Sequence, residues 1–126
     1  MEPRFIMPER PTKGYKAVIT YNQFRWYVLE MDIPDDATIV HAGHGFYRTD
    51  KVVPVHFWAT RYKLAITDTA AHSWFDKDFA YTIGHTATSK LDLNLNDDCV
   101  AGIHFFDNFY QAMNWGNANF GYTAAI

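Results

Sequence analysis

The sequence predicts an α+β fold, namely a compact and mostly antiparallel β domain with one C-terminal α-helix. Three observations lead to this class. The length of 126 residues suits a single domain, because domains cluster near ~100–150 residues. Short segments rich in β-branched and aromatic residues alternate with turn signals through residues 15–83, as in antiparallel sheets. The clearest helical spacing of apolar residues follows residue 107.

An extended arm is predicted for residues 1–14, and a single globular domain for residues 15–126. Prolines at positions 3, 8 and 11 forbid a helix in the arm and disfavour an interior strand. The arm packs either on its own domain or on a neighbouring subunit of an oligomer, and the sequence leaves both alternatives open.

The first two strands are predicted to form a hairpin. Residues 15–21 (YKAVITY) and 25–31 (RWYVLEM) are rich in β-branched and aromatic residues, which favour strands. The turn signal Pro-Asp-Asp-Ala follows at 34–37. A third short strand is then expected at 38–42 (TIVHA).

The middle of the chain is predicted to contain a loop and two further strands. Two glycines predict a flexible loop over residues 43–50, because glycine adopts backbone angles that other residues avoid. Residues 52–58 are expected to form a strand, in which Pro54 indicates an edge or a bulge. Residues 59–78 are ambiguous, and residues 79–83 (FAYTI) return to a strand.

The helix is predicted over residues 107–115. Asp107 and Asn108 are natural N-cap residues, and Gly116 stands where a glycine commonly follows the last turn of a helix. Apolar residues at 109, 112, 113 and 115 recur with the spacing of one helix face. A short strand-like run at 102–106 comes directly before this helix.

The composition excludes several classes of protein. No apolar run approaches the ~18–20 residues of a membrane span, and the start of the chain lacks the pattern of a signal peptide. A net charge of −3 argues against a protein dedicated to duplex DNA or RNA, which is normally basic. With Cys99 as its one cysteine, the chain forms no intrachain disulfide. We therefore expect a cytoplasmic protein.

Aromatic residues are abundant, and arginines are unevenly distributed. Aromatics make up 17% of the chain. All five arginines lie in residues 1–63, where nine Lys and Arg stand against seven Asp and Glu, while residues 64–126 hold two against seven. An anionic ligand would therefore be bound mainly by the first half. The alternative is that these arginines serve solubility and surface pairing.

The block at residues 99–106, C-V-A-G-I-H-F-F, with Ala112 and Trp115 downstream, resembles a C-x-x-G-I-H-F-F pattern. That pattern marks a small domain of unknown function from phages and large viruses, often found behind pentapeptide repeats. The resemblance runs over residues 14–116 and includes weaker pieces upstream: Tyr15-Lys16, Leu29 with Ile33-Pro34 and Ala37, Tyr47 to Lys51 with Val53, and Tyr81 with Gly84. It implies a viral setting and supplies no catalytic residue. This chain carries no pentapeptide repeats.

Six histidines raise the question of a metal site. His41 and His44 are three positions apart, and His56 or His104 is a candidate third ligand. No H-E-x-x-H motif and no Cys/His cluster accompanies them. A metal-dependent hydrolase is therefore the least favoured interpretation, and we predict no metal and no cofactor.

Other catalytic patterns are equally incomplete. Residues 92–97 imitate the start of a calcium loop but lack its later glycine and glutamate. The chain has no G-x-S-x-G elbow and no glycine-rich phosphate loop. Cys99 lies beside an apolar run, where a thiol more often packs than reacts. We therefore predict that the protein is not an enzyme.

Arginine stands close to aromatic residues in three places, around residues 25–27, 46–48 and 58–62. Aromatic rings stack on nucleobases, and arginine binds phosphate bidentately. The predicted ligand-binding residues are Arg48, Tyr47, Phe46 and His44 in the glycine-flanked loop, with Arg61, Trp74, Arg25, Trp26 and His104. Tyr47 and Trp74 are expected to sandwich bases, while Arg48 and Arg61 hold phosphates. The alternative is that most of these rings fill the core and that His104 bonds to backbone there.

These features lead to two hypotheses of function. The first is a phage protein in the host cytoplasm that binds and sequesters a cyclic or signalling nucleotide made by host immunity, as a homo-oligomer with pockets shared between subunits. The second is a protein–protein interaction module, an inhibitor of a host protein or a virion accessory, since interfaces are also enriched in Tyr, Trp and Arg. The effect of Arg48→Ala or Arg61→Ala on nucleotide binding would distinguish them.

Overall fold

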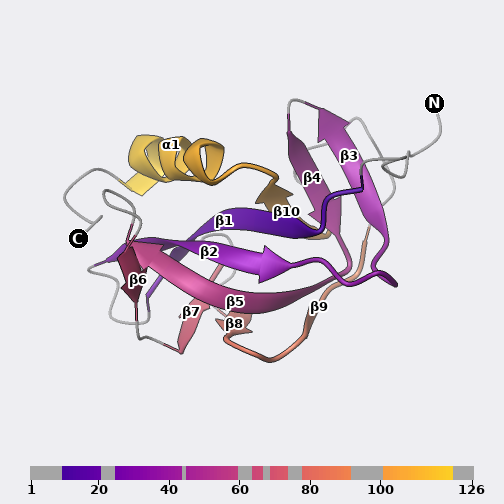
Figure 1. Cartoon of the computed structure of the whole chain (residues 1–126), viewed down its shortest axis with the longest axis horizontal. Coiled ribbons are helices and arrows are strands. Elements are labelled where there is room, and N and C mark those ends of the chain that lie inside the picture. Colours follow the sequence, from indigo (N-terminus) through magenta and orange to yellow (C-terminus); the bar gives the residue numbers. More distant parts are fainter. Residues whose placement is uncertain are drawn as a thin grey trace.

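Strands of a bent antiparallel sheet make up most of the structure, and a helix covers part of one face (Figure 1). The computed structural model describes residues 10–20, 25–43, 45–59, 64–66, 69–73, 78–91 and 101–120. In chain order the elements are β1 (Lys13–Ile19), β2 (Trp26–Asp32), β3 (Ile39–Gly43), β4 (Phe46–Thr49), β5 (Lys51–Ala59), β6 (Leu64–Ile66), β7 (Ala70–His72), β8 (Ala80–Thr82), β9 (Ala87–Thr88), β10 (Ile103–Phe106) and α1 (Phe109–Phe120).

The strand order places the first hairpin at the centre of the sheet. Within the described residues the order is β3-β4-β10-β1-β2-β5-β6, while β7 pairs with β1 and β8, and β9 pairs with β5. All these pairings are antiparallel. The predicted hairpin corresponds to β1 and β2, and the ambiguous residues 59–78 contribute β6 and β7. The α+β class predicted from the sequence is therefore confirmed.

Apolar side chains pack on both faces of the sheet, because alternate residues of a strand point to opposite faces. On the inner face, Val18, Leu29 and Phe57 belong to a large buried cluster that β7, β8 and β10 help to enclose. On the outer face, Ala17 and Val28 belong to a second cluster, which lies beneath α1. Within the described residues, α1 therefore covers part of the outer face.

Residues 46–49 form the second strand of a hairpin with β3, which corrects the prediction of a flexible loop over residues 43–50. Gly43 at the end of β3 and Gly45 just before β4 have φ angles of +98° and +76°, which glycine adopts readily. β4 lies between two partners, because Arg48 pairs with Val40 of β3 and with His104 of β10. Neighbours on both sides pair the backbone of β4, and the exposed fraction of the Arg48 side chain is only 2%.

Helix α1 begins at Phe109, two residues after its predicted start, and continues past its predicted end. The Asn108 side chain caps it, because its Oδ1 accepts bonds from the backbone N–H of Tyr110 (2.8 Å) and Gln111 (3.2 Å). Gly116 does not end the helix, which runs to Phe120. The glycine is buried inside the helix instead, and a methyl group there would overlap the ring of Trp26. Close packing against the Trp26 indole therefore explains why a glycine occupies position 116.

Strand β5 contains the bulge that Pro54 indicated. Its register against β2 shifts between Glu30, which faces His56, and Met31, which faces Pro54. The extra residue bends β5 and increases its twist. The strand is not at an edge, since β2 lies on one side and β6 and β9 pair with it as well.

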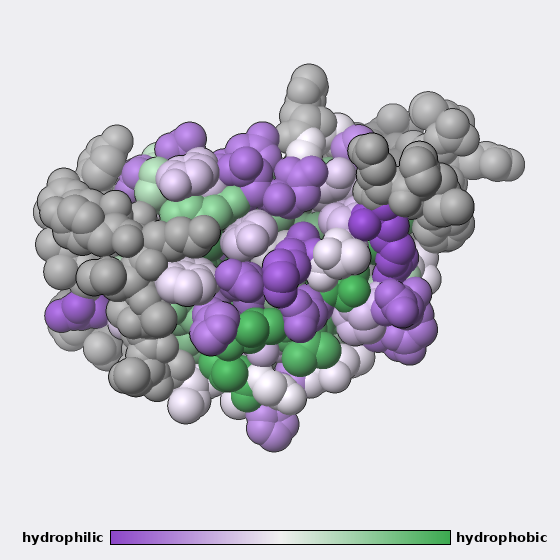
Figure 2. Space-filling model, viewed as in Figure 1, coloured by the Kyte–Doolittle hydropathy of each residue, from purple (hydrophilic) through white to green (hydrophobic). Residues whose placement is uncertain are grey.

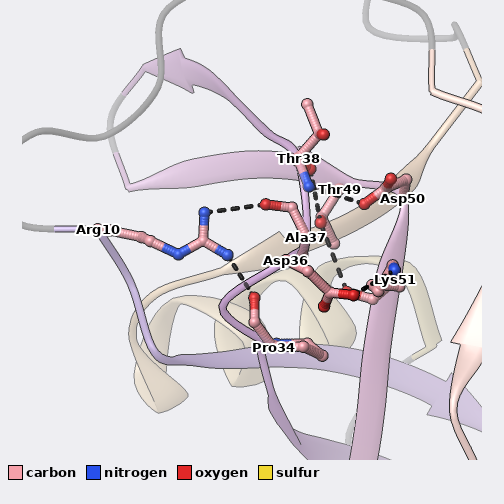
Figure 3. A network of polar contacts seen from close by, with 8 residues as sticks. All are labelled: Arg10, Pro34, Asp36, Ala37, Thr38, Thr49, Asp50 and Lys51. Atoms are coloured by element: carbon pink, nitrogen blue, oxygen red, sulfur yellow. Dashed lines mark hydrogen bonds and ion pairs between the residues drawn. The ribbon is translucent and has the colours of Figure 1, made fainter.

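The described end of the predicted N-terminal arm is attached to the turn after β2. The Arg10 guanidinium donates from Nη1 to the Ala37 carbonyl oxygen (2.9 Å) and from Nη2 to the Pro34 carbonyl oxygen. Figure 3 shows how neighbouring polar contacts continue this link towards β4 and β5. Residues 1–9 lie outside the described residues.

Candidate functional site

A row of partly exposed side chains crosses five strands on the outer face, beside the cluster that packs beneath α1. Residues directly opposite one another on neighbouring strands share a face. Phe106 is opposite both Phe46 and Tyr15, and Glu30 is opposite both Tyr15 and His56. We call these five residues the cross-strand row, which runs from β4 through β10, β1 and β2 to β5.

One end of the cross-strand row is aromatic and partly open to solvent. The ring centroids of Phe46 and Phe106 are 4.9 Å apart, and Phe46 stacks on His104 at 5.5 Å with an interplanar angle of 29°. Tyr15 meets the Phe109 ring edge-on at 6.2 Å. All of these rings except Phe109 are partly exposed. Such a surface can accept another flat ring by stacking.

The other end of the cross-strand row is polar and organised around a carboxylate. Glu30 Oε1 accepts a hydrogen bond from Trp58 Nε1 (3.0 Å), and its Oε2 lies 3.4 Å from Lys13 Nζ. Lys13 Nζ also binds Asp32 Oδ1 at 2.8 Å. The Glu30 side chain is 13% exposed, so it is fixed in place but reaches solvent. Hydrophilic residues dominate the middle of the face shown in Figure 2.

The electrostatics of this cluster follow from burial and from its opposite charges. The hydrogen bond to Asp32 raises the pKa of Lys13, and Glu30 adds to the rise. Partial burial raises the pKa of the Tyr15 phenol, and the Glu30 carboxylate raises it further while Lys13 opposes the change. Lys13 is therefore a cation and Tyr15 a neutral hydrogen-bond donor near neutral pH.

Four of the residues predicted to bind a ligand come together on β4 and β10. Arg48 is directly opposite His104, and Phe46 and Tyr47 lie on the same strand as Arg48. Phe46 and His104 face the partly open surface. Tyr47 and Arg48 are buried. Arg48 Nη1 donates to the Ala101 carbonyl oxygen at 3.1 Å.

Tyr47 points to the inner face, and Trp26 packs beneath the helix. The Tyr47 ring stacks between Phe105 (5.2 Å) and His41 (4.6 Å), and its hydroxyl donates to Asp107 Oδ2 at 3.2 Å. Trp26 is fully buried and meets Phe120 of α1 edge-on at 5.5 Å. In this arrangement neither ring offers a face to a stacking base, so both are structural here.

The remaining predicted residues do not join this cluster in the described structure. Arg25 is exposed and precedes Trp26 at the start of β2, which is the end of the strand away from Glu30. His44, Arg61 and Trp74 lie outside the described residues.

Four residues of this surface were not predicted as site residues from the sequence, namely Lys13, Tyr15, Glu30 and Phe106. The signal was the period of two within strands: Glu30 is the first acidic residue after the apolar run at residues 26–29 and lies on the same face as Trp26 and Val28. His56 appeared only as a candidate metal ligand, although it stands opposite Glu30. These residues come together only through the register between strands, which a local sequence motif does not predict.

The described residues contain no group of three His, Cys, Asp or Glu side chains arranged to hold a metal ion. The calcium-like run at residues 92–97 and Cys99 lie outside those residues. Within the same described ranges, no helix combines the length and hydropathy that a membrane crossing requires.

Comparison with known proteins places the whole cross-strand row inside a recognised family match. The model of a family of unknown function, DUF5758, matches residues 4–112. A curated relative, "Uncharacterized protein L223" of Acanthamoeba polyphaga mimivirus, is 32% identical over 95 residues, which covers 70% of this chain. The match spans 61% of that relative's length. No solved structure matches the chain.

Proposed function

The chain belongs to DUF5758, a family of unknown function with a viral relative, and from this premise we propose that it is a viral binding domain that sequesters an immune signalling nucleotide. The observation that carries the proposal is the cross-strand row, which joins partly exposed rings to polar groups on one sheet face. Ligand sites commonly combine an aromatic lining with a few placed polar groups.

The two ends of the cross-strand row suit the two chemical parts of a nucleotide. A base stacks on Phe46, Phe106 or Tyr15, and each stacked base contributes ~1–3 kcal/mol. Lys13 and His56 at the polar end meet phosphate oxygens. Arg61 is proposed as a further phosphate contact, while buried Arg48 supports β4 through the Ala101 carbonyl. This arrangement differs from the sequence-based hypothesis, in which Arg48 itself held phosphate.

The proposal describes binding without chemical change of the ligand. It includes a homo-oligomer in the cytoplasm of the infected host cell, where a second subunit would cover the open side of the cross-strand row. Binding alone lowers the free concentration of a signal, so a sequestering protein needs affinity and abundance rather than turnover.

The test is a thermal shift of the purified protein against cyclic dinucleotides, cyclic trinucleotides and cyclic ADP-ribose isomers, followed by heat release and mass spectrometry of the ligand. A ligand at ~100 times its Kd stabilises a protein by ~2.7 kcal/mol, which raises Tm by several degrees in a domain of this size. We expect the double variant Phe46→Ala/Phe106→Ala to lose the shift.

Tyr110→Ala is the matched control, since it removes an aromatic side chain that is 60% exposed and lies outside the cross-strand row. This variant should keep the thermal shift. A released ligand that is cleaved would contradict sequestration, and the absence of any shift across the panel would contradict nucleotide binding altogether.

The second candidate function is a protein–protein interaction module, and the exposure of Tyr110 favours it. Tyrosine is enriched at the centres of protein interfaces, and Tyr110 is 60% exposed at the start of α1. In that case Tyr110→Ala abolishes recovery of one host or virion protein in a pulldown, while the Phe46→Ala/Phe106→Ala variant still recovers it.

A further inference from the structure

We infer that Glu30 makes the cross-strand row selective for guanine-bearing nucleotides. This inference rests on the proposed function and names its ligand class. It starts from the Glu30 carboxylate, which lies opposite the partly exposed Tyr15 ring and is an unusual neighbour for a site that binds an anionic ligand. A group in that position must be compensated electrostatically, and it must have a hydrogen-bonding role.

The Glu30 carboxylate is held in one orientation. Trp58 Nε1 donates to Oε1 from β5, and Lys13 Nζ lies against Oε2 from β1. The residue itself sits in β2 between these two strands. A carboxylate has about four acceptor positions, and these contacts use two of them. The remaining positions can accept bonds from the solvent side, because the side chain is 13% exposed.

Lys13 reduces the repulsion that Glu30 would exert on phosphate. Its ammonium is shared between Glu30 (3.4 Å) and Asp32 (2.8 Å), so both carboxylates are partly neutralised. Lys13 is also 49% exposed and keeps donor capacity for another anion. The polar end can therefore accept a donor-bearing base edge and a phosphate close to each other.

The strand register positions a base edge at Glu30. Tyr15 is directly opposite Glu30, and opposite side chains on one face have Cβ atoms ~4.5–5.5 Å apart. A base stacked on the Tyr15 ring thus presents its edge to the carboxylate. Phe106, opposite Tyr15 on the other side, extends the stacking surface away from the charge.

Guanine is the base whose edge fits a carboxylate. Its N1–H and N2–H groups are adjacent donors that point the same way, so they match two carboxylate oxygens as a charge-assisted bidentate pair. Adenine offers one donor beside the unprotonated N1 acceptor on that edge, and the acceptor faces a negative oxygen. Sites that hydrogen-bond a ligand discriminate strongly against analogues that leave such groups unpaired.

The experiment is isothermal titration of the full chain with cyclic di-GMP and cyclic di-AMP. The wild-type protein is expected to bind cyclic di-GMP roughly 10- to 100-fold more tightly than cyclic di-AMP, because the additional hydrogen bonds are made to a charged group. Glu30→Gln retains an oxygen for the Trp58 N–H but places an amide where guanine needs acceptors. This variant should bring the affinity ratio close to one without abolishing binding of cyclic di-AMP.

Asp32→Asn is the matched control, because it removes a carboxylate that also binds Lys13 but lies two residues further along β2. It should leave the guanine preference unchanged. Phe106→Ala reports on stacking and should weaken both ligands together.

The outcomes separate this inference from the proposed function. Equal affinity for both ligands in wild type, or a guanine preference that survives Glu30→Gln, overturns guanine selection and leaves nucleotide binding intact. If neither ligand binds and no other nucleotide in the thermal-shift panel does, the proposed function fails and the inference fails with it.

Discussion

At the scale of single residues, Lys16 is a partly buried cation. Its Nζ donates to the His104 carbonyl oxygen at 3.0 Å. Burial lowers the pKa of Lys16 to about 8, from an ordinary value of 10.5. The structure around it therefore disfavours the charged form, and this preference must appear in the pH dependence of stability.

Between pH 8 and 10.5 the unfolded chain keeps a proton that folded Lys16 has released, so the free energy of unfolding rises with pH in this window. The whole pKa shift of Lys16 corresponds to at most about 3 kcal/mol in the free energy of unfolding, because partial solvent contact screens the charge. Lys16→Met lacks this group. Urea unfolding at several pH values should show wild type gaining stability relative to Lys16→Met between pH 8 and 10.5, and a constant difference would contradict the burial of the charge.

Individual site residues were only partly predictable from sequence. Phe46 and His104 were predicted and do face the partly open surface. Trp26 was not distinguishable as a core residue, because both faces of its strand are covered near α1 and the usual alternation of apolar and polar residues is lost there. Arg48 was predicted to hold phosphate at the surface, because arginine is seldom buried, but its side chain is buried here.

At the scale of elements, the contact between α1 and β2 depends on the absence of a side chain at residue 116. Gly116→Ala would place a methyl group against the Trp26 ring. Alanine favours a helix over glycine by ~1 kcal/mol, but overpacking a core costs ~1–3 kcal/mol. We expect net destabilisation of up to about 2 kcal/mol in urea unfolding.

Asn114→Ala is the comparison for that substitution, because Asn114 is exposed in the same helix. This change should be neutral or slightly stabilising, as helix propensity alone dictates. If Gly116→Ala stabilises the protein as well, the helix does not rest on the indole as described.

Elements with local signals were predicted, and elements defined by distant partners were not. The cap at Asn108 and the β1–β2 hairpin follow from nearby residues. Strand β4 was mistaken for a loop because glycines precede it and its second partner, β10, is far along the chain. Glycine propensity is visible in a short window, whereas pairing with a distant strand is not.

At the scale of the whole molecule, Arg10 connects the chain before β1 to the turn that follows β2. Its two hydrogen bonds reach Ala37 and Pro34. The neighbouring contacts in Figure 3 include Lys51 Nζ with Asp36 Oδ2 (2.9 Å) and the Thr38 N–H with Asp50 Oδ1 (2.8 Å). The link therefore ties the central hairpin to the β3–β4–β5 side of the sheet.

Loss of this link should loosen that side of the sheet first. Hydrogen bonds from a charged donor contribute ~1.5–3 kcal/mol, so Arg10→Ala is expected to destabilise the protein by about 1–2 kcal/mol after solvent replaces part of the bonding. Hydrogen exchange should accelerate in β3 and β4 more than in α1. Arg10→Lys, which cannot span both carbonyls, should be intermediate, and unchanged exchange in Arg10→Ala would refute the link.

The position of β10 beside β1 has a consequence for how the chain acquires its structure during synthesis. Lys16 and its His104 partner are 88 positions apart, and Tyr15 pairs directly with Phe106. The central strand therefore cannot complete its hydrogen bonding until residue 106 has left the ribosome. Contacts of such long range slow folding, and an incomplete nascent chain would expose the edge of β1 to neighbouring chains.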